Sequence, residues 1–222
     1  MTKRKTLLIA MGAVLALAAL PAHALFIETS YVGDDDGGGV WSHEDNSRIT
    51  GEQLQATAEF TVSGTELDVL LSNTGDTTTA PADILQGVFF SSGSDVEITP
   101  RDPVGLGDGS DFIGDDGDLD TLQGWAYRND LATGDANPFN DVYGVTHGIA
   151  NPGFDTFSGD DTFATWEGED DDQWPSHPPA GSYGIVSGTT DDDPGPPLVG
   201  DYVRNSLLFT FNVDQGFDPG SI

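Results

Sequence analysis

The most regular alternation of apolar and polar residues lies in the first half of the chain. Residues 58–62 (AEFTV) and 67–71 (LDVLL) place apolar side chains at every second position, and Gly64-Thr65 lies between them. A period of two predicts half-buried strands, and the tight reversal joins them into a β-hairpin with one apolar face. Residues 81–83 (PAD) predict a short turn or a single helical turn, and residues 85–90 (LQGVFF) predict a third, more fully apolar strand.

Short apolar segments bounded by Gly, Pro, Asn and Asp continue along the rest of the chain. They predict further strands at residues 25–32, 95–99, 124–127, 182–186 and 203–213, the last with Leu207, Phe209, Phe211 and Val213 on one face. Residues 40–42 fit a short strand or an aromatic plug, and residues 47–55 are expected to lead into the first hairpin strand. Residues 142–145 form a short apolar segment, whereas residues 148–182 show little periodicity. With no helix of ordinary length, the pattern predicts an all-β fold, a single-domain antiparallel β-sandwich with long acidic, Gly-rich loops.

Residues 1–24 have the pattern of a secretory signal peptide. Lys3-Arg4-Lys5 forms a basic start, residues 7–20 are apolar, and Ala22-His23-Ala24 matches the small-x-small cleavage rule. The apolar run is too short for a convincing membrane span, so we expect cleavage after Ala24 rather than a retained anchor. The chain is therefore expected to consist of a signal peptide, 1–24, and one β-sandwich domain, 25–222, with no membrane span in the mature chain.

The formal charge is strongly negative and becomes more negative once the leader is removed. Three of the seven basic residues lie in the leader, so the mature chain keeps four arginines and no lysine against 38 acidic residues, a formal charge of −34. Nucleic acid is excluded as a partner, because phosphate binding requires basic patches. Such a charge favours solubility in concentrated salt, which indicates a halophilic or marine source, or it favours a role for bound cations. The chain has no cysteine, so its core must hold the fold without disulfides.

A glycine- and aspartate-rich stretch carries the main candidate for a metal site. Residues 107–113 (GDGSDFI) and 116–122 (DGDLDTL) place Asp111 and Asp120 nine residues apart. A period of nine with Gly-x-Gly-x-Asp is typical of the calcium-binding β-roll, in which carboxylates and loop carbonyls surround a hard cation. Two degenerate repeats are too few for a complete β-roll, which needs several stacked turns.

The second half of this stretch also has the spacing of a calcium loop. Asp116, Asp118 and Asp120 occupy alternate positions, but Thr121 and Tyr127 stand where an EF-hand requires Gly and Glu. The stretch is therefore either a weak calcium site or a solvated acidic loop. The candidate ligands are Asp111, Asp116, Asp118 and Asp120.

Patterns of catalysis are missing from the sequence. His43, His147 and His177 are scattered through predicted loops without the spacing of a transition-metal site. No Gly-x-Ser-x-Gly elbow marks a serine nucleophile. Glycoside cleavage uses a pair of carboxylates, but among 38 acidic residues some pair will always be close, so such pairs do not indicate this activity. We therefore predict no catalytic residues, no enzymatic activity and no cofactor other than calcium.

Tryptophans provide the second candidate site, an aromatic platform for sugar rings. Trp125 lies within an apolar segment, so we expect it in the core. Trp166 and Trp174 flank the acidic run 168–172 in predicted loops and are the better candidates for exposed carbohydrate-binding residues. The alternative is that they cap the core, as loop aromatics often do.

An ordered set of short motifs along the mature chain resembles a known family. The motifs are FTVSGTEL (60–67), LSNT (71–74), PADIL (81–85), VFF (88–90), TP (99–100), GWAY (124–127), YGV (143–145), YGI (183–185), VRNSLLFT (203–210) and GFD (216–218). In this order they resemble the exosortase-dependent surface proteins, the XDD-type branch of the PEP-CTERM sorting class.

The resemblance implies an exported, all-β bacterial protein of the cell surface or extracellular matrix, with no assigned catalytic residues. It also implies a C-terminal Pro-Glu-Pro signal, a hydrophobic span and a basic end, which the sorting protease recognises. None of these stands in the sequence, and we expect that the chain is truncated after Ile222. Expected partners are therefore the export machinery and, at full length, the sorting protease, together with extracellular polysaccharide or other surface proteins.

Three other functions predict different arrangements in space. A carbohydrate-binding module predicts that Trp166 and Trp174 are coplanar and exposed on one face or rim. A calcium-stabilised adhesin predicts that the four candidate aspartates converge on one point. A hydrolase requires a concave pocket that holds a carboxylate pair or a Ser/His pair.

Overall fold

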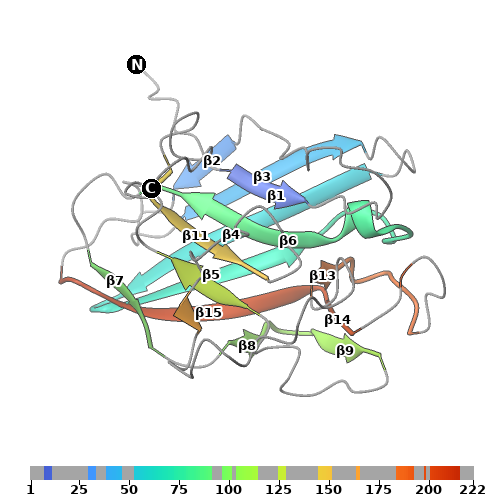
Figure 1. Cartoon of the computed structure of the whole chain (residues 1–222). Coiled ribbons are helices and arrows are strands. Elements are labelled where there is room, and N and C mark those ends of the chain that lie inside the picture. The colour runs from blue at the N-terminus through green and yellow to red at the C-terminus, as the bar shows by residue number, and fades with distance from the viewer. Residues whose placement is uncertain are drawn as a thin grey trace, which may run out of the picture.

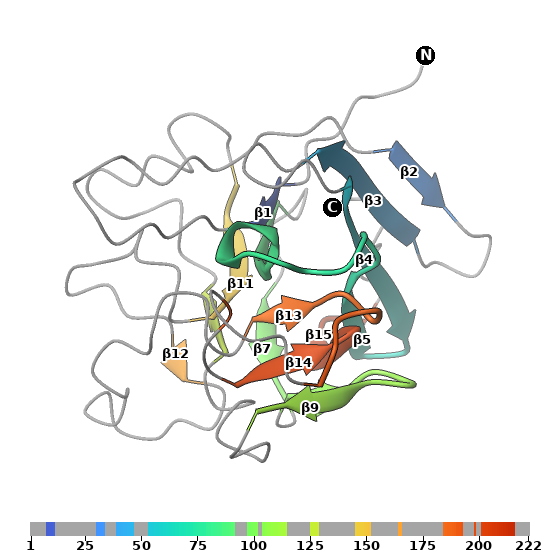
Figure 2. The same ribbon diagram turned by 90° about the vertical axis from the view of Figure 1, so that its right-hand side faces the viewer.

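Two β-sheets face each other across a shared apolar interior (Figure 1). The computed structural model describes residues 8–11, 30–33, 39–46, 53–91, 97–101, 104–114, 125–128, 145–151, 164–165, 184–192, 198 and 201–215. Figure 2 shows the layers from the side, with β3 and β4 in one and β1 and β11 in the other. The expected all-β sandwich is confirmed.

The first layer, which we call the long-strand sheet, contains the longest strands of the protein. Its members are β2 (Ser30–Gly33), β3 (Gly39–Asn46), β4 (Gln53–Ser63), β5 (Glu66–Asn73), β7 (Ile98–Pro100), β8 (Gly105–Leu106) and β15 (Ser206–Val213). Their order is β2-β3-β4-β5-β15-β7, with β8 beside β15, and all pairs are antiparallel.

The β4–β5 hairpin confirms the predicted pair of alternating strands. Val62 pairs with Leu67 and Ser63 with Glu66, so Gly64-Thr65 forms the reversal. Alternate residues of β4 are buried from Leu54 to Phe60, and β15 alternates in the same way. This pattern places the apolar face of each strand against the opposite sheet.

The second layer, which we call the short-strand sheet, is built from many brief segments. Its members are β1 (Leu8–Met11), β6 (Leu85–Phe90), β9 (Asp111–Ile113), β10 (Ala126–Arg128), β11 (His147–Ala150), β12 (Ala164–Thr165), β13 (Ile185–Val186) and β14 (Tyr202–Arg204). The order is β12-β10-β11-β6-β13-β14-β9, with β1 also paired to β6. The β13–β14 pair is parallel and the other pairs are antiparallel, so this sheet is mixed. One turn of 3₁₀-helix, η1 (Pro81–Asp83), precedes β6 and is one of the two alternatives predicted for these residues.

Some predicted boundaries are wrong, and each difference has a local cause. The strand predicted over residues 203–213 is two strands in different sheets, because Asn205 has a φ of 77° and turns the chain between β14 and β15. β11 lies partly in a region without periodicity, since all four of its residues are buried and no alternation can mark it. β1 lies within the expected leader, and residues 12–29, which hold most of the first predicted strand, are outside the described part.

Aromatic side chains from both sheets join in the interior. Phe60 of β4 meets Phe90 of β6 edge-on, with ring centroids 5.3 Å apart. Trp125, next to β10, lies against Phe209 of β15 at the same separation, and its side chain is fully buried. Burial of such rings contributes about 2 to 3 kcal/mol each relative to exposure, so these contacts hold the layers together.

Candidate functional site

Arg204 lies on β14, next to the edge strand β9 of the short-strand sheet, and forms ion pairs with two acidic side chains. Its Nε lies 3.4 Å from Oδ1 of Asp111, the cross-strand partner of Arg204 on β9, and its guanidinium also donates a hydrogen bond to Asp192. The Arg204 side chain is 19% exposed, whereas Asp111 and Asp192 are mostly exposed. The hydrogen bond to Asp192 raises the pKa of Arg204, with further help from the negative charges of Asp111, Asp192 and Asp191. The Arg204 guanidinium therefore neutralises part of the negative charge at this edge of the sheet.

The glycines of the candidate calcium stretch form the tight turn before β9. Gly109 has a φ of +73°, and the Ser110 N–H donates to the Gly107 carbonyl at 3.1 Å. A Cβ on Gly107 would lie 2.1 Å from Oγ of Ser206, so a larger residue there would have to displace the Ser206 side chain. The strand that follows pairs antiparallel with β14, whereas nonapeptide β-rolls are parallel helices. The turn therefore has a structural reason for its glycines.

The four aspartates predicted as calcium ligands are only partly within the described residues. Asp111 is exposed and shares the Arg204 guanidinium, so a cation at Asp111 would compete with that ion pair. Asp116, Asp118 and Asp120 lie outside the described part, and calcium binding stays a prediction. Within the described residues, no cluster of three or more metal-ligating side chains occurs.

The prediction for Trp125 is confirmed, because its indole is buried in the shared core. Trp166 and Trp174 lie outside the described residues, so the aromatic platform stays a prediction.

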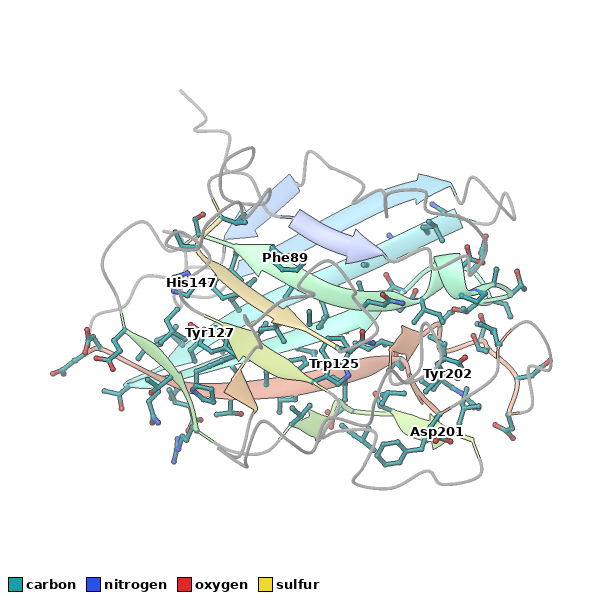
Figure 3. The ribbon with its side chains drawn as sticks, in the orientation of Figure 1. Phe89, Trp125, Tyr127, His147, Asp201 and Tyr202 are labelled. Atoms are coloured by element: carbon teal, nitrogen blue, oxygen red, sulfur yellow. The ribbon has the colours of Figure 1, made fainter. Side chains whose placement is uncertain are left out.

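His147 was expected in a loop, and that expectation is wrong. It lies in β11 and is 5% exposed, stacked on Phe90 of β6 at 5.2 Å and on Tyr127 of β10 at 6.2 Å (Figure 3). Its Nδ1 shares a hydrogen bond of 2.6 Å with Thr146 Oγ1. Burial lowers the pKa of His147 to about 4, so the ring is neutral at pH 7. His43, also expected in a loop, lies in β3, and His177 is outside the described residues.

Tyr127 completes this buried aromatic group. Its ring meets Phe211 of β15 edge-on at 4.8 Å, and burial raises the pKa of its hydroxyl well above the usual range. The hydroxyl has no hydrogen-bond partner among the described residues. Because Tyr127 and His147 are at most 5% exposed, they pack between the sheets and have no access to a substrate from solvent.

A network of polar side chains, which we call the polar clasp, joins the two sheets at one end. Asn73, at the end of β5, donates through Nδ2 to the carbonyls of Asp83 (3.2 Å) and Ile185 (3.0 Å). Its Oδ1 accepts the N–H of Gly75 at 3.3 Å. Asn73 is 2% exposed, so these bonds satisfy backbone groups that water cannot reach.

The second half of the polar clasp consists of hydroxyl groups. The Ser187 N–H donates to Thr78 Oγ1 at 2.9 Å, and the Thr78 N–H donates to Thr190 Oγ1 at 3.1 Å. Ser187 Oγ donates to the Gly75 carbonyl at 2.8 Å. Sequence reasoning missed this network, since most of its bonds join residues that lie 109 to 112 apart. The only feature of the sequence that could have indicated the network is the pair of hydroxyl-rich segments, residues 77–79 (TTT) and 187–190 (SGTT).

No helix in the described part of the chain is long and apolar enough to cross a membrane. Comparison with known proteins finds no matching family model, no matching curated protein and no matching solved structure. Function must therefore be argued from the residues themselves.

Proposed function

We propose that the chain is an exported, non-enzymatic bacterial protein of the cell surface or extracellular matrix. The observation that carries the proposal is the leader pattern of residues 1–24, a basic start, an apolar run and an Ala-x-Ala site. The buried histidine and tyrosine are enclosed in the core, and the polar groups of the clasp are bonded to backbone. Among the described titratable groups, His147 and Tyr127 therefore serve packing, and Arg204 serves charge balance.

The charge of the mature chain supports a place outside the cell in concentrated salt. Four arginines face 38 acidic residues, so most carboxylates have no basic partner. At about 1 M salt the Debye length is roughly 3 Å, which screens this repulsion and leaves a strongly hydrated, soluble surface. Arg204 and Arg101, which pairs with Glu66, are the arginines whose ion pairs the structure describes.

The resemblance to exosortase-dependent proteins adds a route to the surface. At full length, a PEP-CTERM signal would deliver the sandwich to a sorting protease and then to the envelope or matrix. Expected contacts there are extracellular polysaccharide and other surface proteins.

Export is tested by producing the chain in a bacterial host and measuring the intact mass of the exported product. We expect a product that begins at Leu25. The matched controls are Ala24→Leu, which blocks the small-residue position next to the cleaved bond, and Ala16→Leu, which leaves that position intact. A wild-type product that stays in the cytoplasm with residues 1–24 attached would reject the proposal.

A calcium-stabilised adhesion module is the second candidate function. It is favoured by the alternating carboxylates of Asp116, Asp118 and Asp120, which follow β9 in the sequence. Calcium should then raise the unfolding temperature more than magnesium at matched ionic strength, and Asp118→Asn should remove the difference. Asp192→Asn, which removes an acid from the Arg204 pair, is the control with the same charge change. If only bulk salt stabilises the protein, this second function is rejected.

A further inference from the structure

Gln86 supplies the one polar side chain of β6, and this side chain is fully buried. β6 lies next to β11 and β13 in the short-strand sheet, with β11 beside it in Figure 1. Gln86 is 0% exposed, and so are Leu85 and Val88 of the same strand, which belong to the shared core. A carboxamide at this depth is withdrawn from bulk water, so its hydrogen bonds must be made inside the protein.

The Gln86 carboxamide has no hydrogen-bond partner among the described residues, at either Nε2 or Oε1. Such a group offers two N–H donors and one carbonyl acceptor. The carboxamide of Asn73, which is nearly as buried, makes three hydrogen bonds in the polar clasp. Buried polar groups of native proteins are bonded to the chain or to internal water, because an unbonded group keeps the whole cost of its desolvation.

An irregularity in β6 places this side chain. Leu85 and Val88 both belong to the shared core although they are three residues apart, whereas regular alternation has a period of two. The pairing with β1 shifts its register at the same place and leaves Gln86 without an opposite residue on β1. An extra residue of this kind is a bulge, which changes the direction in which a side chain points.

Polar groups of two other segments lie beside Gln86. Its carbonyl accepts the Asn151 N–H at 3.0 Å, so Asn151 stands across from it just after β11. The Asn151 side chain is 2% exposed, and its Nδ2 lies 3.2 Å from the position of a Cβ on Gly184. The Leu85 carbonyl oxygen lies 3.2 Å from the same position. The absence of a side chain at Gly184 therefore leaves room for neutral polar groups next to the peptide that joins Leu85 to Gln86.

We propose that the Gln86 carboxamide binds an internal water molecule, with the Asn151 side chain as a further partner. Water is small enough to be enclosed in a core, and it both donates and accepts hydrogen bonds. An ion would need a charged group to offset the loss of its hydration, and neither carboxamide carries a charge. The water would add a bridge between β6 and the end of β11 to the backbone pairing of these strands.

The experiment uses the full chain, made without export, so that processing of the leader does not affect the result. Nuclear Overhauser spectra of nitrogen-labelled protein should show a cross-peak between water and the carboxamide protons of Gln86. Its sign should be that of a water molecule that tumbles with the protein. Gln86→Met, which lacks the carboxamide, identifies these signals by their loss.

Stability provides the second measurement. Gln86→Met keeps the length of the side chain but removes its polar atoms, so a bridging water loses a partner. The unfolding temperature should fall by at least about 3 °C. Gln53→Met makes the same change at an exposed position of β4 and should shift the unfolding temperature by less than about 2 °C.

The inference is overturned if the Gln86 carboxamide gives no cross-peak with water, or if its protons are bonded to another residue of the chain. A higher unfolding temperature of Gln86→Met also overturns it, because removal of the carboxamide would then relieve an unbonded group. If this variant does not fold, the wild-type spectrum decides alone. The proposed function does not depend on these outcomes, since they concern the interior and not export.

Discussion

The two sheets of this protein are held together by different means. The long-strand sheet contains strands of up to 11 residues, and its β4–β5 hairpin joins neighbours in sequence. The short-strand sheet contains strands of two to six residues, which come from distant parts of the chain. The first sheet forms from local alternation, whereas the second depends on burial of β6 and on the polar clasp. We therefore expect the short-strand sheet to respond more to changes in polar groups.

The largest effect is expected from a change in the core that both sheets share. Phe209→Ala removes the ring that packs on Trp125 and should lower the free energy of unfolding by about 3 to 5 kcal/mol. Leu208→Ala, on the half-buried face of the same strand, should cost less than about 2 kcal/mol. Urea unfolding of both variants measures the difference. Equal losses would show that the Trp125 contact does not join the layers.

Acid should weaken the short-strand sheet through His147. Its pKa is about 4 in the folded chain and about 6.5 when unfolded, so the unfolded chain binds the proton more readily between these values. The free energy of unfolding therefore falls as the pH drops from about 6.5 to 4, by about 3 kcal/mol in total. His147→Phe keeps the ring stack with Phe90 and Tyr127 but should lack this component.

The measurement for His147 is urea unfolding of both proteins at several pH values between 7 and 4. The difference between them isolates the histidine from the many carboxylates, which titrate in both chains. Parallel curves would contradict a neutral, buried imidazole.

The polar clasp should be more important to the short-strand sheet than to the hairpin. Asn73→Asp keeps the shape of the side chain but replaces the donor to two buried carbonyls with an acceptor, at a cost of about 2 to 3 kcal/mol. Thr74→Asp adds the same charge at an exposed neighbour and should change stability by less than about 0.5 kcal/mol. In Asn73→Asp, the amide exchange rates should rise first in β13, whose Ile185 carbonyl loses its donor. If the amides of β4 and β5 exchange at the same rate as those of β13, the polar clasp is no more important to the short-strand sheet than to the hairpin.

The smallest effect is expected where the chain passes from one sheet to the other. Asn205 has a φ of 77°, a conformation that glycine adopts freely and β-branched residues do not. Asn205→Val should therefore be about 1 to 2 kcal/mol less stable than Asn205→Gly. Both variants lose the bond from Asn205 Nδ2 to the Asp108 carbonyl, so that bond does not contribute to their difference. Thermal unfolding of the pair measures it.

The sequence by itself determined the fold class and the elements with clear alternation. The β4–β5 hairpin, η1, β6 and the buried face of β15 follow from local patterns, because side chains that alternate along a strand report which face meets the core. The burial of Trp125 was also predicted from its apolar neighbours. The acidic surface and the leader pattern likewise need no structure to be recognised.

Only the tertiary structure decided how the short segments assemble. β11 has no alternation because it is buried on both faces, and the clasp between Asn73 and Ile185 joins residues 112 apart in sequence. The division of residues 203–213 between two sheets depends on one left-handed residue that no periodicity marks. Short strands carry too few side chains to define a period, so their partners are set by long-range packing and by the backbone groups that must be satisfied.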